Sequence, residues 1–428
     1  MPAARLEGWL SEGRRHLWRP YTQEKTAPSP VAVERTDGVR LYLADGRELI
    51  DGISSWWTAC HGYNHPHIRA AVERQLAKMP HVMLGGLVHE PASTLAVRLA
   101  ERLPGTLNRV FFSDSGSVAV EVAMKIAIQH GLNRGEKGRT RFVSFRGGYH
   151  GDTFACMSVT DPEEGMHALF QGALFEQIVV DVPRSDDGFH ELDALLSRER
   201  TSLAGMILEP LVQCAGGMRF HEPEGVARLH ALCRKHGILF LLDEVATGFG
   251  RTGTMFACEQ AGVVPDVVCL SKALTGGTLP LAATVATDEV YEAFYDDDPR
   301  HALMHGPTFM ANPLACSAAL ASLELFDREP RLEQVARVEA QLEEELASCR
   351  EVSGVVDVRV KGAIGAVQLE DGAKALDWLR ARFVDEGVWV RPLGDVVYLM
   401  PPFVIDEGDL RGLTRAVNVV VREWASRR

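Results

Sequence analysis

The 428-residue sequence predicts an α/β protein with a mainly parallel sheet. Two short runs, residues 238–242 (ILFLL) and 267–270 (VVCL), are wholly apolar, as strands buried on both faces of a parallel sheet are. Strand-like and helix-like segments alternate between residues 108 and 270, which is the pattern of successive strand–helix units. After residue 328, a charged helix and several short strands indicate a smaller α+β domain.

Composition narrows the class of protein. Hydrophobic residues make up 46% and charged residues 24% of the chain, which is typical of globular proteins. The formal net charge of -13 argues against a surface for nucleic acid or anionic membranes. The N-terminus has no apolar signal-peptide core, and no run approaches the ~18 apolar residues needed to span a bilayer. We therefore expect a cytoplasmic protein that binds neither nucleic acid nor membranes.

The cysteines are scattered through the sequence, and none forms a CxxC pair. Most lie in apolar surroundings, so reduced core thiols are expected rather than disulfides or a zinc site. The positions concerned are Cys60, Cys156, Cys214, Cys233, Cys258, Cys269, Cys316 and Cys349.

The two ends of the chain are expected to pack together. Residues 41–43 and 49–50 alternate like strands and are joined by Asp45-Gly46, a favourable hairpin turn outside the main sheet. We therefore divide the chain into an N-terminal segment (1–53) that packs with the small domain, a large domain (54–328) and a C-terminal small α+β domain (329–428).

The remaining elements follow from apolar periodicity and from runs that stop at polar or glycine residues. In the large domain, strands are predicted at 108–112, 141–145, 178–180 and 204–208, and helices at 93–103, 118–130, 192–198, 223–236 and 312–325. In the small domain, strands are predicted within 355–369 and at 388–391 and 396–400, and helices at 331–348, 373–385 and 406–422.

The two predicted apolar strands are each followed by a side chain that can take part in catalysis. Asp243 follows the first run, and Lys272 closely follows the second. Ligands of open α/β sheets bind outside the carboxyl ends of the strands, so a carboxylate and an amine are expected there. Such a lysine can form a Schiff base with pyridoxal phosphate, and an aspartate can keep the pyridine nitrogen protonated. Taken alone, the two residues could equally be a helix cap and a solvated charge.

Other turns could hold further parts of such a cofactor. Ser113 to Ser117 separate a strand from a helix, and free amides at a helix N-terminus can bind phosphate. Tyr149 lies just past the strand at 141–145, where it could stack on the cofactor ring or be an ordinary loop aromatic. Trp56 and Trp57 would face opposite ways on an extended chain, so at most one is expected in the core.

Eight motifs resemble those of class III pyridoxal-phosphate aminotransferases of fold type I, over nearly the whole chain. They are WRPYT, SSWW, SDSGSVAVE, GYHGDTF, DEVATGFGRTG, SKALTGG, MHGPTFM and GVWVRPLG. Each motif is weak alone, but together and in this order they are specific. They most resemble the branch of the class that serves biotin biosynthesis.

The resemblance implies a role for each cofactor-binding position. Lys272 matches the Schiff-base lysine and Asp243 the partner of the pyridine nitrogen. Gly116 and Ser117 match phosphate-binding positions, and Tyr149 the aromatic that stacks on the ring. Thr308 matches a residue that reaches the phosphate of the neighbouring subunit's cofactor, which implies a homodimer with shared active sites.

The resemblance also implies substrate contacts. The positions that match are Tyr21, Trp56, Gly306 and Arg391, with Tyr398 and Asp152 as secondary candidates and Glu209 and Arg251 as supporting residues. A guanidinium such as that of Arg391 can grip a carboxylate in a bidentate pair. Trp56 could contact a sulfonium by cation–π interaction or simply pack.

In this branch the amino donor is S-adenosylmethionine and the acceptor is 8-amino-7-oxononanoate, which becomes 7,8-diaminononanoate in a ping-pong reaction. Ala215 stands where other class III enzymes carry a glutamate, which favours this branch. At Cys214 and Ser271 the chain departs from the pattern of this branch, in each case by exchanging one small residue for another. The alternatives are another class III ω-aminotransferase that uses lysine or another amine as donor, and a non-catalytic binding module.

Overall fold

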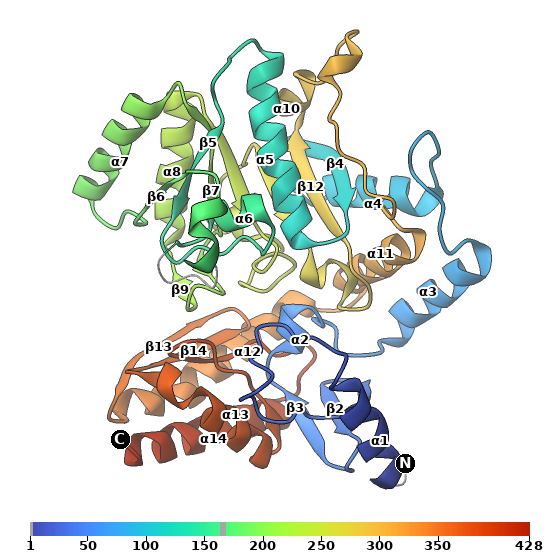
Figure 1. Ribbon diagram of the computed structural model, residues 1–428, viewed down its shortest axis with the longest axis vertical. Helices are drawn as coiled ribbons and strands as arrows, with labels where there is room; N and C mark the ends of the chain where they lie inside the picture. Colours follow the sequence, from blue (N-terminus) through green and yellow to red (C-terminus); the bar gives the residue numbers. More distant parts are fainter. Residues whose placement is uncertain (1–2, 163–167) are drawn as a thin grey trace.

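The computed structural model describes residues 3–162 and 168–428 (Figure 1). In Figure 1 the upper part of the molecule contains the main sheet, and the lower part contains both ends of the chain. The predicted α/β class is confirmed.

The main sheet has seven strands in the order β4-β12-β11-β10-β7-β5-β6. Their bounds are Leu107–Ser113, Ala282–Thr287, Val267–Leu270, Leu239–Asp243, Leu203–Leu208, Arg141–Phe145 and Ile178–Val180 in that order. All neighbours pair in parallel except at β12, which is antiparallel to both β4 and β11. The sheet is therefore mainly parallel, as predicted.

Strand β12 is an element that sequence reasoning missed. Its sequence, AATVAT, is short and has no large apolar side chain, yet the strand is buried throughout. The small residues allow α5 (Gly116–Asn133) to lie close against the sheet, where Thr284 Oγ1 donates to the Ala119 carbonyl at 2.8 Å.

Both faces of the sheet are buried, so the strands carry no polar face. Phe240 and Leu242 of β10 belong to the apolar cluster that includes α7 (Asp186–Glu199) and α8 (Pro223–His236). Leu241, between them, belongs to the cluster on the other face, with α5. Successive residues of the strand thus serve opposite layers, which explains the continuous apolar run.

In the lower part of the molecule, the two ends of the chain share a sheet. The predicted hairpin is confirmed as β2 (Arg40–Leu43) and β3 (Glu48–Asp51). β15 (Val388–Trp389) pairs in parallel with β3, and β1 (Val33–Asp37) completes the order β1-β2-β3-β15.

A second small sheet carries the C-terminal region. β13 (Val355–Lys361), β14 (Ile364–Leu369) and β16 (Val396–Leu399) are antiparallel, and α12 (Arg331–Leu346) packs on β13 and β14. The closing helix α14 (Glu407–Ser426) packs against α12 and α13 (Leu376–Asp385).

The other helices are α1 (Ala3–Gly13), α2 (Ser54–Trp57), α3 (Pro66–Lys78), α4 (Glu90–Ala100), α6 (Phe154–Val159), α9 (Ala257–Gln260), α10 (Asp288–Glu292) and α11 (Pro313–Arg328). Short 3₁₀ turns are η1 (Ala168–Ala173), η2 (Lys272–Thr275), η3 (Pro299–His301), η4 (Ala347–Glu351) and η5 (Gly372–Ala375), and β8 (Val212–Gln213) pairs with β9 (Arg219–Phe220). Among the helices described, none is long and apolar enough to cross a membrane. All eight cysteines are buried free thiols, as predicted.

Candidate active site

The carboxyl ends of β10 and β11 bring Asp243 and Lys272 to the same edge of the sheet. The strands are parallel neighbours, with Asp243 opposite Cys269, three residues before Lys272. One oxygen of the buried Asp243 carboxylate lies 2.8 Å from His150 Nδ1, and the other accepts the Val245 amide at 3.1 Å. The carboxylate is therefore held in one orientation.

Lys272 is the first residue of η2 and lies in the left-handed region, with a φ of 46°. Its Nζ lies 4.5 Å from the ring centroid of Trp57. Burial lowers the pKa of the Lys272 amine, and the nearby Asp243 carboxylate partly opposes that shift. A lowered pKa increases the fraction of neutral amine, which is the nucleophilic and basic form.

Sequence reasoning missed His150 and Trp57, and each has a recognisable signal. His150 follows Tyr149 directly, in the segment after β5, which β7 separates from β10 in the sheet. Trp57 packs edge-on against Tyr398, with ring centroids 6.2 Å apart, and so forms a wall beside Lys272.

Glu209 lies behind this pair, after the end of β7. Its carboxylate accepts the amides of Tyr149, at 2.9 Å, and Cys214, at 3.0 Å, so it ties the Tyr149 loop to the next segment of the site. Burial raises the pKa of Glu209 to about 7, a shift that the charge of His150 opposes and that of Asp243 strengthens.

The turn predicted to hold phosphate opens α5. Ser115 caps the helix by accepting the Val118 amide at 3.3 Å, and other first-turn amides point out of the helix. A Cβ at Gly116 would lie only 2.8 Å from Val245, so the turn approaches the segment after β10 closely. Ser117 packs against Gly151, which brings the Tyr149 loop to the same helix end.

A group of polar and aromatic side chains lines the outer side of the site. The Tyr149 hydroxyl lies 3.0 Å from Asp152 and 3.4 Å from the Tyr21 hydroxyl. Burial and the hydrogen bond to Asp152 raise the pKa of Tyr21 to about 12. Tyr21 packs edge-on against Trp56, with centroids 6.4 Å apart, and the guanidinium of Arg391 lies 5.9 Å from the Trp56 centroid.

The segment that carries the two tryptophans has an unusual backbone. Residues Ser54 to Trp57 all have positive φ, from 46° to 75°, so the extended chain assumed from the sequence is wrong. The expectation that at most one tryptophan is core is confirmed, since Trp57 is 6% and Trp56 42% exposed. Buried Asp51 fixes the turn by accepting the amides of Ile53 and Ser55.

Gly306 and Thr308 lie apart from this group, on an exposed loop. Lys125 of α5 ties the loop down by donating to the Met304 carbonyl at 2.6 Å. Within the described residues, no contact joins Gly306 or Thr308 to Lys272.

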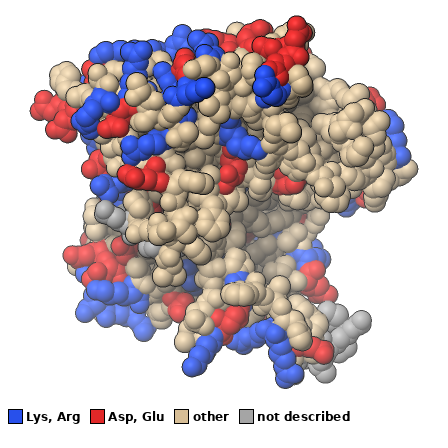
Figure 2. Space-filling model, turned by 45° about the horizontal axis from the view of Figure 1, so that its top comes forward, with Lys and Arg blue, Asp and Glu red and all other residues tan. Residues whose placement is uncertain are grey.

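A cavity of about 610 Å³ lies beside Tyr149, between the two parts of the molecule. Gly148 and Ala215 line it from the main-sheet part, and Leu393 and Val396 line it from the C-terminal region. Figure 2 shows the surface hollowed between the two parts, with mostly uncharged residues in the hollow.

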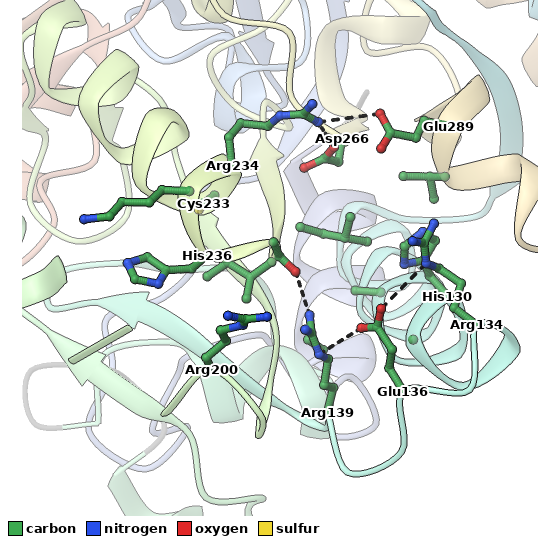
Figure 3. Close-up of a pocket in the computed structure, with 18 residues that line it drawn as sticks. His130, Arg134, Glu136, Arg139, Arg200, Cys233, Arg234, His236, Asp266 and Glu289 are labelled. Carbon is green, nitrogen blue, oxygen red and sulfur yellow. Dashed lines mark hydrogen bonds and ion pairs between the residues drawn. The ribbon is translucent and has the colours of Figure 1, made fainter. Parts of the chain in front are cut away.

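A second cavity of about 410 Å³ lies at the opposite edge of the sheet (Figure 3). It is lined by Leu239, the first residue of β10, and by the C-terminal turns of α5 and α8. Its cations lie at or near helix C-termini, where they complement the helix dipoles, and three of them, Arg134, Arg139 and Arg234, pair with carboxylates of the same cavity. The cations and carboxylates are Arg134, Arg139, Arg200, Arg234 and Lys235, with Glu136, Asp266 and Glu289. We therefore assign this cluster to helix-end stabilisation.

Comparison with known proteins identifies the family. The pattern of the family described as Aminotransferase class-III matches residues 21–421. The chain belongs to the class III aminotransferases. It is 44% identical over 413 residues to the adenosylmethionine-8-amino-7-oxononanoate aminotransferase of Corynebacterium glutamicum, covering 95% of this chain and 97% of that protein. The enzyme of the same name from Mycobacterium leprae is also 44% identical, over 94% of each chain.

Solved structures of the class superimpose closely. The adenosylmethionine-8-amino-7-oxononanoate aminotransferase of Methanocaldococcus jannaschii has a TM-score of 0.92 and 34% identity, over 98% of this chain and 99% of that chain. An (S)-enantioselective omega-transaminase from Thermomicrobium roseum also has a TM-score of 0.92, at 30% identity and 99% coverage of both chains. The family and the fold type predicted from the motifs are confirmed.

Class III aminotransferases use pyridoxal phosphate, and the residues at this edge fit that group. Lys272 has an amine of lowered pKa that could hold the aldehyde, and Asp243 has a fixed carboxylate that could pair with the ring nitrogen. The α5 N-terminus has free amides and a positive dipole end that could bind the phosphate. The donor set therefore matches each functional part of the cofactor.

The buried carboxyl of Glu209 should make stability depend on pH. Its pKa is about 7 in the folded chain and 4.5 for a free side chain, so the folded state binds more protons between these values. Stability should therefore fall as the pH rises through this interval. Glu209→Gln removes the titration, so the variant should gain up to about 3 kcal/mol relative to wild type between about pH 5 and about pH 8.

Denaturant unfolding at each pH measures this difference. Glu34→Gln, which changes an exposed carboxyl on β1, is the matched control and should track the wild type. A Glu209→Gln difference that does not change with pH would contradict the raised pKa.

Proposed function

We propose that the chain transfers the amino group of S-adenosylmethionine to 8-amino-7-oxononanoate, giving 7,8-diaminononanoate in biotin biosynthesis. The observation that carries the proposal is the pairing of a fixed carboxylate, Asp243, with an amine of lowered pKa, Lys272, at one edge of a class III fold. The names of the relatives at 44% identity support the choice of substrates.

Bound pyridoxal phosphate would supply an aldehyde that condenses with amines and a ring that accepts electrons. Lys272 would hold the aldehyde and, once displaced by the donor, remove the proton from the donor's Cα. Asp243, oriented by His150, would keep the ring nitrogen protonated. Gly116 and Ser117 would bind the phosphate, and Tyr149 would cover the ring.

The substrate side would use the group around Trp56. Arg391 would grip the carboxylate of the keto acid, with its guanidinium steered by the Trp56 ring 5.9 Å away. Tyr21 would line the entry beside Trp56, and Tyr398 and Asp152 would support the pocket. Ala215 leaves the 610 Å³ cavity without the glutamate that other class members carry at this position.

The same proposal includes a homodimer with shared active sites. Large apolar side chains are exposed on two segments near each other, since the His81 and Phe309 rings lie 4.5 Å apart. They are Met83, Leu87, Val88, Met304 and Phe309, each more than half exposed. Such a patch favours protein association. In a dimer, Gly306 and Thr308 on this patch would reach the partner's cofactor.

The free cysteines also support a cytoplasmic location, because thiols stay reduced there.

Donor profiling tests the reaction. With pyridoxal phosphate bound, adding S-adenosylmethionine should remove the visible absorbance band of the cofactor, and adding 8-amino-7-oxononanoate should restore it. Lys272→Ala should lose turnover, whereas Lys235→Ala, a surface lysine paired with Asp193, should keep it. A band that ignores S-adenosylmethionine but responds to lysine or another amine would keep the class and replace the donor.

Arg391→Ala should raise the KM for 8-amino-7-oxononanoate roughly tenfold or more, because a charge pair of about 2 kcal/mol is lost. Arg300→Ala removes an exposed guanidinium that pairs only with Asp298 among the described residues, and serves as the control. An unchanged KM for the keto acid would remove Arg391 from the substrate site.

Sedimentation equilibrium should give twice the 47.0 kDa mass of the chain. Phe309→Glu places a charge in the exposed apolar patch and should weaken both the dimer and the retention of pyridoxal phosphate. Val356→Glu, at an exposed position of β13 in the C-terminal region, should affect neither. A wild-type monomer that retains full activity would rule out shared sites.

A further inference from the structure

A buried chain of hydrogen bonds runs from the start of α12 to the backbone beside Lys272. Arg331 Nε donates to His61 Nδ1 at 2.9 Å, and His61 Nε2 lies 3.1 Å from Ser322 Oγ. Ser322 Oγ donates to the Ala273 carbonyl at 3.4 Å. All three side chains are at most 2% exposed, so water does not compete for these contacts.

The chemistry of the groups fixes the direction of every bond. A guanidinium has donors only, so His61 Nδ1 must be the acceptor. Burial, and next the charge of Arg331, lower the pKa of His61 well below its usual value, so the ring is neutral with its proton on Nε2. That proton goes to Ser322 Oγ, which leaves the hydroxyl proton of Ser322 for the Ala273 carbonyl. Each group has one orientation open to it.

The receiving carbonyl lies in the turn that sets the direction of Lys272. Ala273 follows Lys272 in η2, and its carbonyl also accepts the Gly276 amide at 2.9 Å. Lys272 itself has a φ of 46°, a conformation that a non-glycine residue holds only when its surroundings enforce it. A Cβ at Gly276 would lie 3.3 Å from the His61 ring, so this turn packs directly against the chain of hydrogen bonds formed by Arg331, His61 and Ser322.

An apolar core at this place would satisfy packing at lower cost. Arg331 Nη2 is buried without a hydrogen-bond partner, although Glu329 and Gln334 each contact Nη1 at 2.8 Å. Burying a guanidinium costs free energy that apolar side chains of similar volume would avoid. The buried position of Arg331 is explained if its hydrogen bond to His61 fixes the orientation of His61 and, through it, of Ser322.

We propose that Ser322, oriented by His61 and Arg331, is a positioning residue that sets the place of the Lys272 amine. The three residues of this hydrogen-bonded chain come from separate elements: His61 from the segment after α2, Ser322 from helix α11, and Arg331 from the start of α12. The inference rests on the proposed role of Lys272 and extends it to residues that contact neither substrate nor cofactor.

Ser322→Ala removes the hydroxyl and little else. It should lower kcat about tenfold, because a small displacement of a reacting group costs rate more than binding. KM for both substrates should stay within about twofold. In the cofactor-free protein, the rate at which added pyridoxal phosphate bonds to the lysine should fall by a similar factor. Ser322→Cys, nearly isosteric with a weaker donor, should be intermediate and provides a variant that preserves packing.

Ser158→Ala is the matched control, because Ser158 is another buried serine whose hydroxyl donates to a carbonyl, that of Ala155 at 2.6 Å. It should change the melting temperature but neither kcat nor the rate of cofactor bonding. If Ser158→Ala reduces these rates as much as Ser322→Ala does, general destabilisation explains both and the proposal is overturned.

Lys272→Ala, measured alongside, distinguishes failure of the proposed function from failure of the positioning role of Ser322. If it still bonds the cofactor with the wild-type spectrum, the proposed function fails. If it does not, but Ser322→Ala and Ser322→Cys match the wild type in kcat and bonding rate, the function stands and the positioning role is wrong.

Discussion

The parallel pairing of β10 with β11 is the constraint on which the site depends. It places the ends of two buried strands side by side, so that Asp243 and Lys272 meet although 29 positions separate them. Because both strands are covered on both faces, the edge of the sheet is where their chains can turn polar. The same burial lowers the pKa of the Lys272 amine, so the packing that places this lysine also favours its neutral, reactive form.

Around this pair, polar groups and backbone strain act together. Asp51 holds a run of left-handed residues that carries Trp57 to the Lys272 amine, while Glu209 holds the loop of Tyr149. Lys272 is also left-handed, and the turn that follows it accepts the Ser322 hydroxyl. Such conformations persist where surrounding contacts enforce them, and they cluster here at the edge that carries the chemistry.

The sequence predicted the layers of the fold well, because buried strands and amphipathic helices differ in apolar pattern. It failed where small residues form a buried strand, as in β12, and where local rules assume an extended chain, as at Trp56 and Trp57. Asp243 and Lys272 could be found because they follow strand ends. Ser322 could not, since its role depends on a contact with Ala273, 49 residues away in the sequence.

In the proposed reaction, Lys272 is the residue that holds the cofactor. Reduction of the pyridoxal-phosphate-loaded protein with borohydride, followed by peptide mass spectrometry, tests it most directly, because reduction fixes the cofactor to the amine that carries it. We expect the added mass on the peptide that contains Lys272. Modification of another lysine, with Lys272 unmodified, would contradict it.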